Sequence, residues 1–288
     1  MEVNKSYLKY ILALLMFGSN GVISRLITLN SYEIVFMRTF IGSILLIIIY
    51  KVSGGTLDFL KHKKDFFFVI LSGMAMGSGW MFLYEAYTSI GVGISSLLYY
   101  CGPVIVMALS PALFKEKLTY TKITGFVTVV IGLFLVNGKA VTSGGNVWGY
   151  FCGVMSAVLL CILIILNKKA DKIAGLQNSM IQLTSSFLTV AVCVLFKQGM
   201  QIDLAGVNWW AFLVLGLLNT GIGCYLYFSS IPELPVQSVA VLGYLEPMSA
   251  VIFSAVFLAE KMTLAQTIGA ICIIGGAMFG ELAKPKVK

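Results

Sequence analysis

One segment of the chain occurs twice. It begins at Ser95 as SSLLYYCGPVIVMALSPALFKEKLTYTKITGFVTVVIGLFLV and recurs from Val239 as VAVLGYLEPMSAVIFSAVFLAEKMTLAQTIGAICIIGGAMFG. The copies align without a gap at an offset of 144 residues, half of the 288-residue chain. Matching positions are Pro103 and Pro247, Ser110 and Ser254, Glu116-Lys117 and Glu260-Lys261, Thr119 and Thr263, Gly125 and Gly269, and Gly132 and Gly276. A period this long on apolar segments predicts a duplicated membrane domain, with halves at residues 1–140 and 141–288.

Composition agrees with a membrane protein, because apolar residues make up 59% of the chain and charged residues only 11%. An ordinary soluble domain carries about 25% charged residues. The net charge of +8 does not indicate a nucleic-acid partner, since the basic residues lie in short loops between apolar stretches, where they orient a membrane protein. The lipid bilayer is therefore the expected environment.

Ten apolar segments are long enough to cross a bilayer as helices. They run approximately over residues 7–29, 33–50, 66–88, 93–114, 119–137, 147–167, 176–196, 209–230, 234–259 and 263–281. Each half holds five spans, an odd number, so the second half enters the membrane from the opposite side. The predicted fold is an all-α polytopic membrane protein with ten transmembrane helices as two inverted five-helix repeats, an arrangement typical of secondary transporters.

The basic residues predict the orientation of the spans. With a cytoplasmic N-terminus, fifteen lysines fall on the cytoplasmic side, whereas only Lys139, Lys197 and Lys261 fall outside. Arg25 and Arg38 lie within spans. Because cytoplasmic loops collect Lys and Arg, both termini are expected in the cytoplasm, with the protein in the cell (inner) membrane.

The residues resemble the drug/metabolite transporter superfamily, specifically its ten-helix members with two EamA domains. The resemblance covers nearly the whole chain, through FGSNGVISR, EIVFMRTFIGSILL, TGIGCYLYF and the two copies of the repeat. The sequence departs from the family pattern at Phe17, where many members carry Trp, and at Gly102-Pro103, where the second copy has Glu246-Pro247. Membership implies transport of amino acids, amines, sugars or other metabolites, and leaves the substrate open.

Glu246 is the first candidate for a transport residue. It lies about twelve residues into its span, roughly 18 Å along a helix and near the middle of the bilayer. A carboxylate at that depth should face the bundle interior or a cavity, where it could couple protons, contact a substrate amine, or bond a neighbouring helix. Pro103 and Pro247 occupy equivalent depths and predict helix kinks where the two halves meet.

Two further charged residues lie within spans. Glu85, close to Trp80, Tyr84 and Tyr87, is expected near the outer interface. It could act there as an outer gate or a counter-ion for a cationic substrate, or be an acid within an aromatic belt. Arg38 lies about 7.5 Å into the second span by the helical rise. It could hold a substrate carboxylate, pair with Glu33 or bond helix carbonyls, and structure is the favoured interpretation.

Polar and aromatic residues at middle depth could form the wall of a substrate pocket. They are Asn20, Ser24, Tyr99, Tyr100, Tyr225 and Tyr244. Each tyrosine taken alone is more often a packing residue than a ligand contact. The six cysteines all fall in apolar stretches without metal-ligand spacing, so neither a metal nor a cofactor is expected.

The sequence thus predicts a secondary active transporter of a small amino acid, amine or related metabolite, working by alternating access and exporting its substrate. The alternative is uptake of a quaternary or primary amine such as choline. An enzyme is not expected, because the only histidine lies in a loop and neither HExxH nor GxSxG occurs. No GxxxxGK[ST] loop indicates nucleotide hydrolysis, and protons are the candidate coupling ion. Substrate, direction, coupling ion and oligomeric state are left open.

Overall fold

The computed structural model describes residues 2–56, 60–114, 119–142, 146–170, 172–199, 206–230, 234 and 242–282. Every extended regular element within these ranges is helical. The elements of the first half are α1 (Glu2–Gly18), α2 (Asn20–Ser24), α3 (Ser31–Val52), α4 (Lys63–Ile90), α5 (Val92–Tyr99), α6 (Gly102–Phe114) and α7 (Tyr120–Thr142). Those of the second are α8 (Val147–Lys169), α9 (Gly175–Gln198), α10 (Trp209–Leu213), η2 (Val214–Ile222), α11 (Gly223–Ser230), α13 (Leu245–Phe257) and α14 (Leu264–Leu282).

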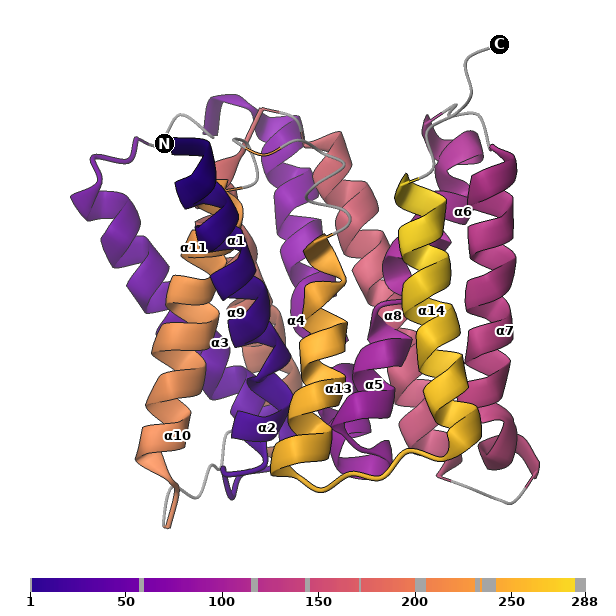
Figure 1. Cartoon of the computed structure of the whole chain (residues 1–288). Helices are drawn as coiled ribbons and strands as arrows, with labels where there is room; N and C mark the ends of the chain where they lie inside the picture. Colours follow the sequence, from indigo (N-terminus) through magenta and orange to yellow (C-terminus); the bar gives the residue numbers. More distant parts are fainter. Residues whose placement is uncertain are drawn as a thin grey trace.

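These elements form ten membrane spans. Six are long and apolar enough to cross a bilayer in full, and four shorter apolar helices supply the others within the described residues. The first span combines α1 and α2, the fourth α5 and α6, and the eighth α10, η2 and α11. In Figure 1 the chain starts α1 at the same face where α14 ends, and α1 and α8 run in opposite directions. The predicted all-α fold with two inverted halves is confirmed.

The packing of the helices follows the inversion. Three pairs join equivalent spans of the two halves directly: α3 with α9, α5 with α13, and α7 with α14. Other contacts also have counterparts: α4 packs on α8 as α11 packs on α1, and α4 packs on α9 as η2 packs on α3. An approximate two-fold axis in the membrane plane therefore relates the halves, and the elements nearest to it enclose the centre of the bundle.

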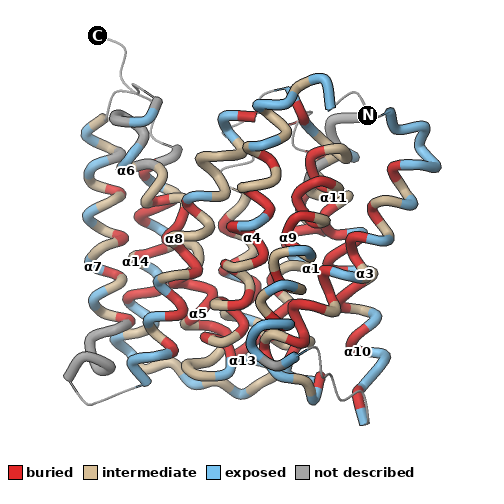
Figure 2. Tube along the Cα trace, turned by 180° about the vertical axis from the view of Figure 1, so that it is seen from behind, coloured by how far each residue is buried: buried red, intermediate tan, exposed pale blue. Residues whose placement is uncertain are grey.

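The outer surface is apolar, as lipid contact requires. Figure 2 shows the buried residues concentrated along α4, α9 and α1, in the middle of the bundle. On α7, at the edge, Ile131 and Phe134 are 51% and 73% exposed. Because these side chains cannot be solvated favourably by water, this face is suited to contact acyl chains.

Glycines bring α7 and α14 into backbone contact. A Cβ atom at Gly132 would lie 2.6 Å from the carbonyl oxygen of Gly269, and one at Gly276 would lie 3.0 Å from that of Gly125. Gly132 corresponds to Gly276 in the repeat and Gly269 corresponds to Gly125, so the two contacts are equivalent. The two-fold axis therefore passes through this helix pair. Small residues at such an interface allow close packing where no hydrophobic effect drives association.

A substitution at Gly276 should therefore destabilise the bundle. Gly276→Leu places a side chain against the backbone of α7, which cannot move aside without displacing the helix, and we expect the melting temperature to fall by ~5 °C or more. The matched control is Gly275→Leu, because Gly275 is exposed and a Cβ there meets nothing within 4 Å. Fluorescence-detected thermal unfolding in detergent measures both; equal melting temperatures would contradict the close contact.

Two spans are interrupted at equivalent positions. The fourth is broken at Tyr100–Cys101, between α5 and α6, and the ninth turns at Tyr244 before α13 begins. Pro103 has no N–H to donate to the carbonyl of Tyr99, and Pro247 has none for that of Gly243. Each interruption thus lies within three residues before a proline of the repeat.

Parts of two sequence predictions fall outside the described residues. The first is the loop that contains Glu116 and Lys117, and the second is the beginning of the ninth span at residues 235–241.

Candidate functional site

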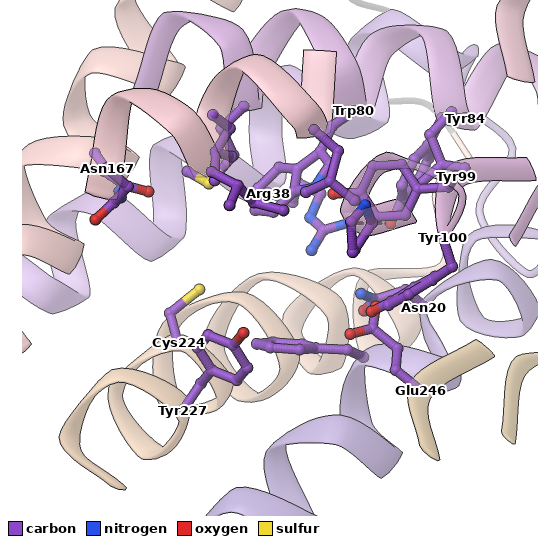
Figure 3. Close-up of a pocket in the computed structure, with 18 of the residues that line it drawn as sticks. Asn20, Arg38, Trp80, Tyr84, Tyr99, Tyr100, Asn167, Cys224, Tyr227 and Glu246 are labelled. Carbon is purple, nitrogen blue, oxygen red and sulfur yellow. Dashed lines mark hydrogen bonds between the residues drawn. The ribbon is translucent and has the colours of Figure 1, made fainter. Parts of the chain in front are cut away.

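A cavity of about 320 Å³ lies at the centre of the bundle. Its walls come from both halves, chiefly from α3, α4 and α5 of the first and α8, α9, α11 and α13 of the second. The polar and aromatic residues that line it are Phe17, Asn20, Arg38, Trp80, Tyr84, Tyr87, Tyr99, Tyr100, Asn167, Gln182, Tyr227 and Glu246. Figure 3 shows Glu246, Asn20 and Tyr100 grouped at one end and Asn167 at the other.

Arg38 is 1% exposed and is held by neutral partners. Its Nε donates to Thr220 Oγ1 at 2.9 Å, and its Nη1 donates to the hydroxyl of Tyr84. The guanidinium carbon lies 4.4 Å from the centroid of the Trp80 ring, a distance at which the aromatic face attracts the cation. The expected alternative of a pair with Glu33 is wrong, because Glu33 accepts instead from the backbone N–H of Asn30 at 2.9 Å. Arg38 is thus a buried cation without a carboxylate partner among the described residues.

The π-helix η2 places the polar pair Asn219 and Thr220. Thr220 Oγ1 donates to the carbonyl of Leu215, five residues earlier, at 2.7 Å, and accepts from Arg38. Asn219 Nδ2 lies 2.7 Å from the carbonyl oxygen of Met16 and 2.9 Å from Asn20 Oδ1. The first contact joins η2 to the carbonyl of Met16, which also accepts from Ser19 at the break between α1 and α2, and the second occupies the oxygen of Asn20. Since the amide oxygen of Asn20 is engaged, its NH₂ group is the end that can donate into the cavity.

Glu246 stands in the first turn of α13, beside Pro247. Its carboxyl lies beside the side chain of Tyr100 (Figure 3), and Arg38 acts on it electrostatically. No ion pair joins it to a cation in the described part of the chain. The cavity therefore carries one acidic and one basic group, each held by neutral neighbours and each able to meet an opposite charge on a ligand.

A chain of amides forms the other end of the cavity. Gln182 Nε2 donates to Asn178 Oδ1 at 3.2 Å, and Asn178 Nδ2 donates to Asn167 Oδ1 at 2.9 Å. Asn167 Nδ2 then donates to Ser72 Oγ at 3.3 Å, and Ser72 donates to the carbonyl of Leu163 at 3.2 Å. A carbonyl can only accept, so this last bond fixes the direction of every amide before it. Gln182 Oε1 is consequently left as a buried acceptor without a partner.

The structure brings together most of the residues predicted for the site. Asn20, Tyr99, Tyr100, Glu246, Arg38, Trp80, Tyr84 and Pro103 all line the cavity. Trp80 and Tyr84 were expected near the outer interface with Glu85, but they face inward. Positions 80, 84 and 87 share one face of a helix, whereas position 85 is rotated by about 100° from position 84.

Five other candidates lie away from this cavity. Tyr244 is buried in the core between α5, α7 and α14, and Tyr225 packs against a cluster around Leu183 and Cys224. Ser24 donates to the carbonyl of Gly21 and lines a separate pocket of about 140 Å³. Glu85 is half-buried and accepts a solvent-exposed hydrogen bond from Trp148 Nε1 at 3.3 Å. Pro247 is buried beside Glu246 without lining the cavity.

Several polar residues in or near the cavity were not expected from the sequence. They are Gln182, Asn167, Asn219 and Thr220. Each is an uncharged polar residue within or at the end of an apolar span, and this position could have indicated them. Tyr227 also lines the cavity. Tyr87, which was expected near the outer interface with Glu85, lines the cavity as Trp80 and Tyr84 do, because the three positions share one face of α4.

Ten spans in two inverted halves around a central cavity with buried charges are the architecture of a membrane transporter. The sequence matches the EamA-like transporter family over residues 4–138 and 147–280. The chain belongs to this family, within the drug/metabolite transporter superfamily.

The relatives include bacterial and human proteins. The chain is 24% identical over 282 residues to the uncharacterized transporter YxxF of Bacillus subtilis, covering 96% of this chain and 89% of that protein. It is 22% identical over 250 residues to the human solute carrier family 35 member G1, and the match covers 82% of this chain and 67% of that protein. A solved crystal structure of a protein with 18% identity superimposes with a TM-score of 0.68 and covers 96% of this chain and 98% of its own, which supports the fold.

Proposed function

We propose that the protein is a secondary active transporter that carries a small amino acid or a related amine-bearing metabolite by alternating access. The observation behind this proposal is that Glu246 and Arg38 line one cavity without forming an ion pair with each other. A zwitterion offers an ammonium group to the carboxylate and a carboxylate to the guanidinium fork. The cavity, at about 320 Å³, is within the range for a small-molecule site.

Charge balance favours a zwitterion over a simple amine. With Glu246 ionised, the two side chains sum to zero charge, and a zwitterion leaves that sum unchanged. A quaternary or primary amine such as choline, the alternative substrate, would add an uncompensated positive charge at low dielectric, close to Arg38. The aromatic walls formed by Trp80, Tyr84 and Tyr100 favour the cationic part of either ligand.

Export is the proposed direction, and Glu246 is the proposed proton-coupling group. The cavity reaches Asn167, near the end of α8 at the face where α1 starts. The distribution of lysines supports a cytoplasmic position for this face. A cavity that extends toward the cytoplasm can load its substrate there, as an exporter must.

Ligand binding and counterflow test the proposal. Purified protein is heated with glycine, L-alanine, L-serine, choline or methylamine, and a ligand at 100 times its Kd should stabilise the fold by about 2.7 kcal/mol. We expect an amino acid to raise the melting temperature and then to exchange in proteoliposomes. Stabilisation by choline alone would establish the alternative, and failure to accumulate a binding ligand against its gradient would indicate a channel.

A further inference from the structure

The carboxylate of Glu260 bonds the beginning of α5. Glu260 Oε1 accepts from the backbone N–H of Val92 at 2.8 Å, and Oε2 accepts from that of Gly93 at 3.0 Å. Both N–H groups lie in the first turn of α5, where no helical partner is available and the helix dipole favours a negative charge. One side chain of the second half thereby bonds the first half through both of its oxygens.

The surrounding backbone is shaped for this contact. Gly91 has φ +87°, and a Cβ added there would lie 2.9 Å from Glu260 Oε1. On the other side, Ala259 has φ +53°, a left-handed conformation that is unfavourable for a residue with a Cβ. The backbone N–H of Glu260 donates to the carbonyl of Ser254 at 3.3 Å and closes the end of α13. A strained residue directly before Glu260 indicates that the surrounding structure holds the Glu260 carboxylate in this position.

This contact lies at the face of the bundle opposite to the one where α1 starts. In Figure 1 the connection from α13 to α14 runs past the start of α5 at that face. α5 leads directly to Tyr99 and Tyr100 in the cavity wall, and α13 carries Glu246. α5 and α13 form one of the three helix pairs that meet across the two-fold axis. Separation of α5 from α13 at this face would open the cavity on this side.

We propose that Glu260 is a positioning residue of the transport cycle: its bonds to Val92 and Gly93 hold this face closed, and their release exposes the cavity on this side. The inference builds on the proposed alternating access. Its readout requires no substrate, so an error in the proposed substrate class would leave the test intact.

The cysteine at position 224 supplies the reporter, because it lines the cavity (Figure 3). Cys224 is kept, the other five cysteines are replaced by alanine, and a membrane-impermeant maleimide is applied to intact cells and to inside-out vesicles. A separate Lys261→Cys variant shows which side of the membrane carries the Glu260 face. For Glu260→Gln, which replaces one acceptor oxygen by an NH₂ group, we expect labelling of Cys224 from the Glu260 side to accelerate at least about tenfold.

The matched control is Lys261→Gln, which changes one charge in the same loop at an exposed residue. Its labelling rate should stay within about twofold of the parent's. Gly91→Ala, which crowds the carboxylate from the other side, should accelerate labelling as Glu260→Gln does and serves if that variant folds poorly. The proposal is overturned if folded variants keep the parent's rate from that side, or if Glu260→Gln lowers only the melting temperature.

Discussion

Glu246→Gln is expected to abolish concentrative transport in proteoliposomes while the protein still folds and inserts. The substitution keeps the size of the side chain and its polar contact surface beside Tyr100 but removes the ionisable group. A hydrogen bond to a charged group contributes about 1.5–3 kcal/mol, so affinity for the amine of the substrate should fall roughly 10- to 150-fold. Any remaining exchange should no longer depend on pH, because the proposed proton carrier is gone.

The control for this variant is Glu85→Gln, the same change in a carboxyl that lies outside the cavity and faces Trp148. Glutamine retains an acceptor for the indole N–H, so the initial rate should change less than about threefold. Size-exclusion profiles check that both variants fold. Normal flux with the parent's pH dependence in Glu246→Gln would remove the coupling role.

Arg38→Lys is expected to weaken binding of an amino acid by roughly 30-fold or more, the lower end of the cost of disrupting a buried charge pair. The charge is retained, but the planar fork that bonds Thr220 and Tyr84 and stacks on Trp80 is lost, so the cation is no longer aimed at a carboxylate. Isothermal calorimetry with the amino acid found in the thermal screen measures the change.

Arg25→Lys is the matched control, since it makes the same change at the other arginine of the chain, which follows α2 at the end of the first span. Arg25 donates to the carbonyl of Tyr87 at 2.6 Å and does not line the central cavity. Its affinity should remain within about threefold of the parent's. Equal losses in both variants would indicate a general effect on folding, and no loss in Arg38→Lys would exclude a carboxylate contact.

The helices and their inversion could be predicted because lipid imposes a simple rule. Each span needs about twenty apolar residues, and the proline in each repeat fixes where the fourth and ninth spans are interrupted. The faces of the spans were harder to predict. In a soluble helix polarity separates the core from the surface, but here both lipid and core are apolar, so hydropathy does not distinguish them.

Tyr100 and Tyr244 illustrate what the repeat could not supply. They occupy the same register, yet Tyr100 lines the cavity and Tyr244 is buried in the core near α7 and α14. The repeat preserves the backbone interruption, while the packing around each tyrosine differs because the two halves differ in their other side chains. Likewise, nothing in the pattern LGLLNTGIG predicted a π-helix, since its wider turn depends on bonds to α1 and α3.

The π-helix η2 has a consequence for how the eighth span can vary. A π segment is in effect an α-helix with one inserted residue, which offsets everything beyond it by about 100° around the axis. Deleting a single residue between Val214 and Asn219 should restore the regular winding and turn the sulfur of Cys224 and the phenol of Tyr227 toward a different neighbour. A one-codon deletion at this point would therefore change which atoms of the eighth span face the cavity, while every residue that lines the cavity is kept.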